Sequence, residues 1–94
     1  MTGDKFYKGE TVSCFLEVRT KQDNVLIDPT SVTITIINGK SGTTKVDASA
    51  MTKSSVGKYS YLWLSDEIGD YKVIYNANNS GSITILKDEF SVSL

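Results

Sequence analysis

Apolar and polar residues alternate along most of this chain, which is the pattern of β-strands that bury one face. The alternation is clearest over residues 10–20 and 31–38, and the second segment is rich in β-branched residues that disfavour a helix. We expect both segments to be strands of a sheet. The side chains predicted to face the core are Val12, Cys14, Leu16, Val18, Val32, Ile34 and Ile36.

The most aromatic part of the chain is a pair of alternating segments, residues 57–64 and 70–75, joined by a short acidic turn. The two segments hold five of the nine aromatic residues, and each places its aromatic side chains on one face. We therefore expect a hairpin in the middle of the core. Its predicted core side chains are Tyr59, Tyr61, Trp63, Tyr71, Val73 and Tyr75.

Turn residues separate these strands from weaker ones. Asn38-Gly39 is the strongest hairpin signal in the chain, and the small residues that follow it over 43–50 predict a strand at a sheet edge. Residues 4–7 are expected to form a short first strand. Residues 52–56 are predicted to be a turn into the aromatic hairpin.

The last strand is expected over residues 82–94. Ile83 and Ile85 share a parity that Phe90 does not, so we predict a bulge at Lys87-Asp88. The whole pattern gives about seven antiparallel strands in two sheets, and no segment has a helical period. The predicted fold class is therefore an all-β sandwich.

The composition fits one globular domain covering residues 1–94. Its hydrophobic fraction is 39% and its charged fraction 22%, values that argue against a disordered chain. Ten basic and eleven acidic residues give a net charge of −1 without a basic cluster, so we expect no nucleic-acid or membrane partner. No basic and apolar leader follows Met1, and no signal peptide is expected.

The residue types that catalysis usually needs are scarce. Histidine is absent, which removes the usual general base and the commonest metal ligand. Cys14 is the only cysteine, so no intrachain disulfide can form, and its place on an apolar strand face indicates a buried core residue. We therefore expect no enzyme, no catalytic residue and no cofactor.

Two short polar motifs allow a second interpretation as binding sites. Asp66, Glu67 and Asp70 carry the oxygen ligands that Ca²⁺ prefers, but no spaced ligand loop accompanies them, which favours a solvated acidic turn. Asn78-Asn79-Ser80 matches the glycosylation pattern without a secretory signal to support it. We predict no metal site from these residues.

Several apolar residues have the wrong parity for the core and indicate a contact surface. Leu62 and Leu64 alternate with the aromatic residues of their strand, and Ile37 and Ile74 lie opposite the core sets of theirs. A single sandwich buries only one side of each sheet, so some of these side chains are expected to stay exposed. We hypothesise that Leu62, Leu64, Ile74 and Ile37 contribute to docking a partner protein or another copy of the chain.

Residues 66–73, Asp-Glu-Ile-Gly-Asp-Tyr-Lys-Val, resemble the approach to strand F of immunoglobulin-like sandwiches. The resemblance implies that the hydroxyl of Tyr71 bonds back to the corner before its strand. It also places Val73 where an immunoglobulin domain has its second cysteine, and Cys14 on strand B, so the family's disulfide is missing. Trp63 lies just ahead of the corner rather than on strand C, unlike the tryptophan of antibody domains.

A longer resemblance runs in order through four segments: Phe-Tyr-Lys-Gly-Glu-Thr-Val at 6–12, Leu-Ile-Asp-Pro-Thr-Ser-Val-Thr-Ile-Thr-Ile at 26–36, Gly-Lys-Tyr-Ser-Tyr at 57–61 and Gly-Asp-Tyr-Lys-Val at 69–73. This order is similar to that of small immunoglobulin-like proteins in the structural modules of tailed bacteriophages. It is more distantly similar to macroglobulin-type and bacterial surface immunoglobulin-like repeats. The turn at 38–42 departs from the proline- or aspartate-containing turn of related sequences.

The phage resemblance implies a non-enzymatic virion protein that decorates the capsid or lies at the neck or tail. Its partners would then be other virion proteins or copies of itself. The alternative is a bacterial or archaeal cell-surface adhesion module that binds carbohydrate or a protein. The expected lack of a signal peptide favours the virion over the cell surface.

Overall fold

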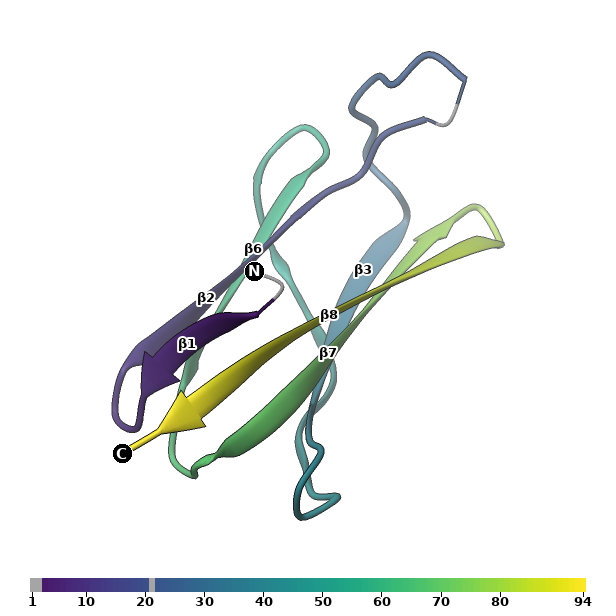
Figure 1. Ribbon diagram of the computed structural model, residues 1–94. Helices are drawn as coiled ribbons and strands as arrows, with labels where there is room; N and C mark the ends of the chain where they lie inside the picture. Colours follow the sequence, from purple (N-terminus) through teal and green to yellow (C-terminus); the bar gives the residue numbers. More distant parts are fainter. Residues whose placement is uncertain (1–2, 21) are drawn as a thin grey trace.

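The computed structural model describes residues 3–20 and 22–94, which form two facing β-sheets (Figure 1). One sheet has five strands in the order β1-β8-β7-β3-β4, and the other has three in the order β2-β6-β5. The strands are β1 (Asp4–Tyr7), β2 (Thr11–Glu17), β3 (Ser31–Asn38), β4 (Thr44–Ala50), β5 (Thr52–Ser55), β6 (Lys58–Leu64), β7 (Gly69–Asn79) and β8 (Ser82–Ser93). No helix long and apolar enough to cross a membrane occurs among these described residues.

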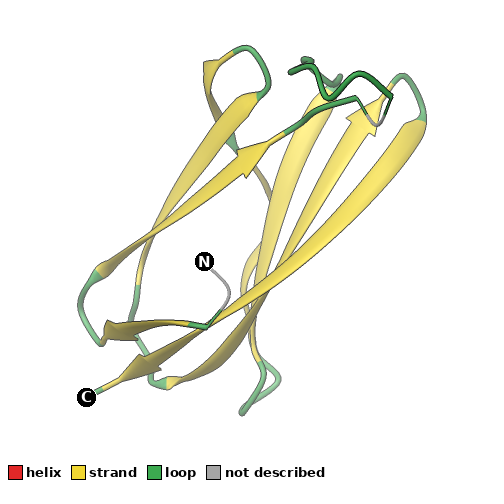
Figure 2. Ribbon diagram, turned by 45° about the horizontal axis from the view of Figure 1, so that its top comes forward, coloured by secondary structure: helices red, strands yellow, loops and turns green. Residues whose placement is uncertain are grey.

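The strand order is that of an immunoglobulin-like sandwich, which confirms the predicted fold class. β7 lies between β3 and β8 in the larger sheet, while β6 lies between β2 and β5 in the smaller one. Figure 2 shows the two layers from a second direction. All neighbouring strands are antiparallel except β1 and β8, which run parallel.

Three boundaries differ from the sequence prediction. Most of the turn expected over residues 52–56 is strand β5. This strand pairs with β6 and raises the strand count to eight. The strand expected over 10–20 ends at Glu17, after which Arg19 forms an isolated bridge to Leu26. β7 continues to Asn79 instead of ending at residue 75.

The predicted bulge at Lys87-Asp88 is wrong. β7 and β8 pair without interruption along the whole length of the hairpin. The parity of the strand is constant, so Phe90 points into the core while Ile83 and Ile85 point outward, with 58% and 55% of their surface exposed. The change of parity in the sequence therefore marks two outward isoleucines and no extra residue.

The predicted core side chains lie between the two sheets. Cys14, Ile34, Ile36 and Val73 are completely buried, and Tyr61 and Trp63 pack partly buried at the margin of the core. An aromatic cluster fills one end of the core. In this cluster the ring of Phe90 stacks on the ring of Tyr71 at a centroid distance of 5.1 Å. The other rings of the cluster are Phe6 and Trp63.

Candidate interaction surfaces

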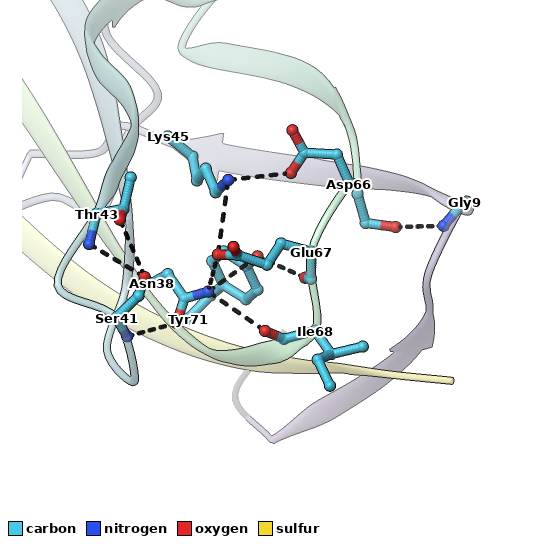
Figure 3. Close-up of polar contacts among 10 residues, drawn as sticks. Gly9, Asn38, Ser41, Thr43, Lys45, Asp66, Glu67, Ile68 and Tyr71 are labelled. Carbon is cyan, nitrogen blue, oxygen red and sulfur yellow. Dashed lines mark hydrogen bonds and ion pairs between the residues drawn. The ribbon is translucent and has the colours of Figure 1, made fainter.

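The acidic turn between β6 and β7 is tied down by the hydroxyl of Tyr71, as the resemblance implied. This hydroxyl donates a hydrogen bond of 2.6 Å to the backbone carbonyl of Glu67 (Figure 3). Burial raises the pKa of Tyr71, and the Glu67 carboxylate contributes in the same direction against the opposing charge of Lys45. The hydroxyl thus keeps its proton at neutral pH and remains a donor.

Asn38, at the end of β3, joins the same corner to the turn before β4. Asn38 is 1% exposed, and its side-chain amide donates to the Glu67 carboxylate at 2.7 Å and to the Ile68 carbonyl at 3.3 Å. Its carbonyl oxygen accepts the backbone N–H groups of Lys40 and Ser41. The sequence identified Asn38 only as a turn residue, because its partners near β7 lie some 30 positions away.

The carboxylates of the acidic turn serve structural contacts. The Lys45 ammonium lies 3.4 Å from Asp66 and 3.6 Å from Glu67, bridging β4 to the turn. Asp70 lies on the exposed side of β7. Within residues 3–20 and 22–94, no three His, Cys, Asp or Glu side chains gather as a metal site would require.

Replacing Tyr71 with phenylalanine is expected to lower the free energy of unfolding by about 1–2 kcal/mol, since the Glu67 carbonyl loses the donor of a partly buried hydrogen bond. Urea denaturation with Trp63 fluorescence as the probe measures the change. Tyr7→Phe is the matched control, because Tyr7 is 65% exposed. Equal effects of the two substitutions would show that the corner hydrogen bond contributes nothing.

Cys14 lies in the middle of the core with its side chain against β7. Burial raises its pKa to about 11, partly offset by a contact with the hydroxyl of Tyr75. The thiol therefore holds its proton at neutral pH, and a protonated buried thiol is a poor nucleophile.

The four predicted surface residues do not gather on one face. Leu62 and Leu64 lie on the outer side of the three-stranded sheet, with exposed fractions of 66% and 62%. Ile37 and Ile74 are partly exposed on the outer side of the five-stranded sheet. The two pairs point away from each other because the whole sandwich lies between them.

The outer side of the three-stranded sheet carries an apolar patch that also includes Phe15, and we call Phe15, Leu62 and Leu64 the Leu62 patch. Phe15 on β2 is 73% exposed and lies opposite Ser60, so it is a diagonal neighbour of Leu62 on β6. The sequence contained a signal for Phe15, since it interrupts the polar parity of its strand.

The outer side of the five-stranded sheet carries a second apolar set, which we call the isoleucine row. In the strand pairing, its four members lie level with residues 72, 74, 76 and 78 of β7. They therefore follow an oblique line across β3, β7 and β8. In that order they are Ile37, Ile74, Ile85 and Ile83. The row ends at the edge of β8. Its last two members were not predicted as surface residues, because their parity was explained by the bulge expected at Lys87-Asp88.

A groove of about 250 Å³ opens between the end of β2 and the first half of β8. Its apolar lining comes from both sheets. The apolar residues that line the groove are Leu16, Val18, Tyr75, Ala77 and Leu86.

Comparison with known proteins supports the architecture. No protein-family model and no curated protein matches the chain. Among solved structures, it is similar to the crystal structure of an engineered protein from the Northeast Structural Genomics Consortium, with a TM-score of 0.68 and 18% identity over 99% of this chain. The chain spans 18% of the length of that engineered protein. At this identity the likeness establishes the fold alone.

Proposed function

We propose that this chain is a non-enzymatic structural component of a tailed-bacteriophage particle and that it binds another particle protein through the Leu62 patch. The observation that carries the proposal is the exposure of Phe15, Leu62 and Leu64 together on one sheet face. The phage context comes from the resemblance of the four ordered sequence segments. The chain also has a second expected partner, another copy of itself, which would bind at the β8 edge described below.

The Leu62 patch has the chemistry of an interface centre. Its large side chains are separated on the sheet by small polar ones, and the only charges in the register, Glu17 and Lys58, lie opposite each other at one end. Full burial of a leucine or phenylalanine side chain contributes roughly 1.5–3 kcal/mol. Binding energy concentrates in a few central residues that become fully desolvated, and the three side chains of the Leu62 patch are placed to form such a centre.

The chain's reactive groups support a binding role over a catalytic one. There is no histidine in the sequence, and the single cysteine is buried with its pKa raised to about 11 by burial. The carboxylates of Asp66 and Glu67 face Lys45 instead of a shared substrate site.

The test is to look for the chain in gradient-purified particles of the phage whose genome encodes it. We expect a copy number that matches a shell or ring site, and we expect Leu62→Glu to abolish incorporation. Val56→Glu is the matched control, because Val56 is also exposed but lies in the turn between β5 and β6. Both variants are expected to keep the unfolding midpoint within a few degrees of the unmodified chain.

Two results would overturn the proposal. The first is absence of the chain from washed particles. If the chain is absent from particles and binds cell-surface carbohydrate, the adhesion alternative is supported. The second is normal incorporation of Leu62→Glu, which would show that the Leu62 patch contacts nothing in the particle.

A further inference from the structure

The edge of the five-stranded sheet is only partly covered at β8. β1 pairs with β8 along Phe90–Ser93 and stops there, so it protects the C-terminal third of the strand alone (Figure 1). Within the described residues, no strand pairs with the outer edge of β8 from Ser82 to Leu86. An uncovered strand edge is a template for another strand.

The direction of the backbone groups on this edge follows from the pairing. The carbonyls of Glu89 and Ser93 accept hydrogen bonds from the N–H groups of Gly3 and Lys8, so odd-numbered residues of β8 direct their backbone groups away from β7. The β7–β8 register has no interruption, so this alternation continues through the first half of β8. Ile83 and Ile85 therefore present their N–H and C=O groups to the uncovered side.

The side chains of this half-strand are apolar on both faces. Ile83 and Ile85 lie on the outer face at the end of the isoleucine row, and Leu86, which is 47% exposed, lies on the inner face beside the groove. The segment Ser-Ile-Thr-Ile-Leu contains no charge, proline or bulge, the devices that usually protect sheet edges.

The other sheet edges carry such devices or are short, as is β1 with its four residues. The pairing of β4 with β3 shifts register twice, and Ala48 adopts a positive φ of 46°. β5 has only four residues and shifts register against β6. β2 leads into an exposed ion pair of 3.0 Å between Glu17 and Arg19 next to the groove. The first half of β8 is therefore the edge best suited to accept a strand.

We propose that two copies of the chain join through their β8 strands, paired antiparallel to form one ten-stranded sheet. The second copy is the occupant because its own edge supplies what this edge requires: an extended, uncharged segment with apolar side chains on both faces. The inference rests on the β8 edge and does not depend on the phage role or on the Leu62 patch.

Hydrogen bonding and charge select the register. Only odd-numbered residues can exchange backbone hydrogen bonds across the new edge, and pairing Ile83 with Ile85 of the second copy brings the isoleucines together. Thr84 then lies opposite Thr84 of the second copy on the two-fold axis. The two Lys87 side chains fall at opposite ends, about 20 Å apart at 3.4 Å per residue, so they do not repel. The two isoleucine rows meet to form one apolar stripe, and each Leu86 lies beside the second copy's strand on the groove side.

The first experiment is a cysteine cross-link in the full chain. In the proposed register the two Thr84 residues form a non-hydrogen-bonded pair with Cα atoms about 4.5 Å apart, a distance that a disulfide spans. Thr84→Cys is expected to form a disulfide-linked dimer in air. Leu86→Cys is the control on the same face, because it lies opposite residue 82 and is expected to remain unlinked. The unmodified chain controls for Cys14, which is buried.

The second experiment measures the mass of the unmodified chain and of Ile85→Pro by light scattering over a range of concentrations. Proline removes the N–H that points to the uncovered side and leaves the hydrogen bonds to β7 intact. We expect a dimer for the unmodified chain and at least a tenfold weaker dimer for Ile85→Pro with an unchanged circular dichroism spectrum. Ile85→Lys introduces a charge without a backbone change and is expected to weaken the dimer as well.

A chain that stays monomeric at millimolar concentration without a cross-link at residue 84 would overturn the proposal. A dimer that survives both substitutions at Ile85 would overturn it too, because the contact would then lie elsewhere. Leu62→Glu separates the two proposals, since it is expected to leave this dimer intact while removing the chain from particles.

Discussion

Replacing Phe90 with alanine is expected to lower the free energy of unfolding by about 3–5 kcal/mol. The ring of Phe90 is 2% exposed and contacts three other rings: it stacks on Tyr71 at 5.1 Å, meets Phe6 edge-on at 5.6 Å and lies 6.1 Å from Trp63. These residues come from β8, β7, β1 and β6, so alanine would leave a cavity where four strands meet. The hydrogen-bonded sheets cannot collapse into that space without breaking their pairing.

Urea denaturation followed by the fluorescence of Trp63, the only tryptophan, measures this loss directly. Phe15→Ala is the matched control, since it removes the same atoms from a residue that is 73% exposed on the outer face of β2. We expect it to change the free energy of unfolding by less than about 0.5 kcal/mol. A loss for Phe90→Ala as small as that for Phe15→Ala would contradict the central position of the aromatic cluster.

The fold could be predicted from the sequence because the core follows a period of two. Val12, Cys14 and Leu16 alternate with polar residues, and a strand that buries one face requires this pattern. The aromatic hairpin added the position of the corner, because a tyrosine two residues after Gly69 is typical of the immunoglobulin-like approach to strand F. The first prediction came from local periodicity and the second from the family resemblance, and the structure confirms the strands and their buried faces.

Elements without a local signal were missed. All four residues of β5 are exposed, and its sequence, Thr-Lys-Ser-Ser, contains no apolar residue. It is a strand because its backbone pairs with β6, which no periodicity reveals. Asn38 was missed as a corner residue for a related reason, because its bond to Glu67 joins residues 29 positions apart.

The candidate surface was predicted in part. Parity correctly placed Leu62 and Leu64 on a face opposite their core neighbours, and both are exposed. Parity alone could not show that Ile74 lies on the other side of the molecule, because that depends on which sheet each strand joins. The outward position of Ile85 was missed because the change of parity before Phe90 was interpreted as a bulge at Lys87-Asp88, which the continuous pairing of β7 and β8 excludes.

The second large effect is expected at Gly69, the first residue of β7. Its φ is +152°, and a Cβ atom added there would lie 2.6 Å from the side-chain oxygen of Asn38 and 2.8 Å from the nitrogen. The Asn38 amide cannot move aside without releasing Glu67 and the turn at Lys40. We therefore expect Gly69→Ala to lower the free energy of unfolding by about 2–4 kcal/mol.

Gly81→Ala separates the clash from the backbone strain. Gly81 also has a positive φ, +92°, but an added Cβ there meets nothing within 4 Å, so only the strain of about 1–2 kcal/mol remains. Combining Gly69→Ala with Asn38→Ala removes the clashing atoms, and we expect the double variant to lose less stability than the sum of the two single variants. Additive losses, measured by the same urea denaturation, would show that the two side chains do not compete for space. The β6–β7 corner would then owe its stability to the hydroxyl of Tyr71 and the Lys45 ion pairs. The close packing of Asn38 against Gly69 would contribute nothing.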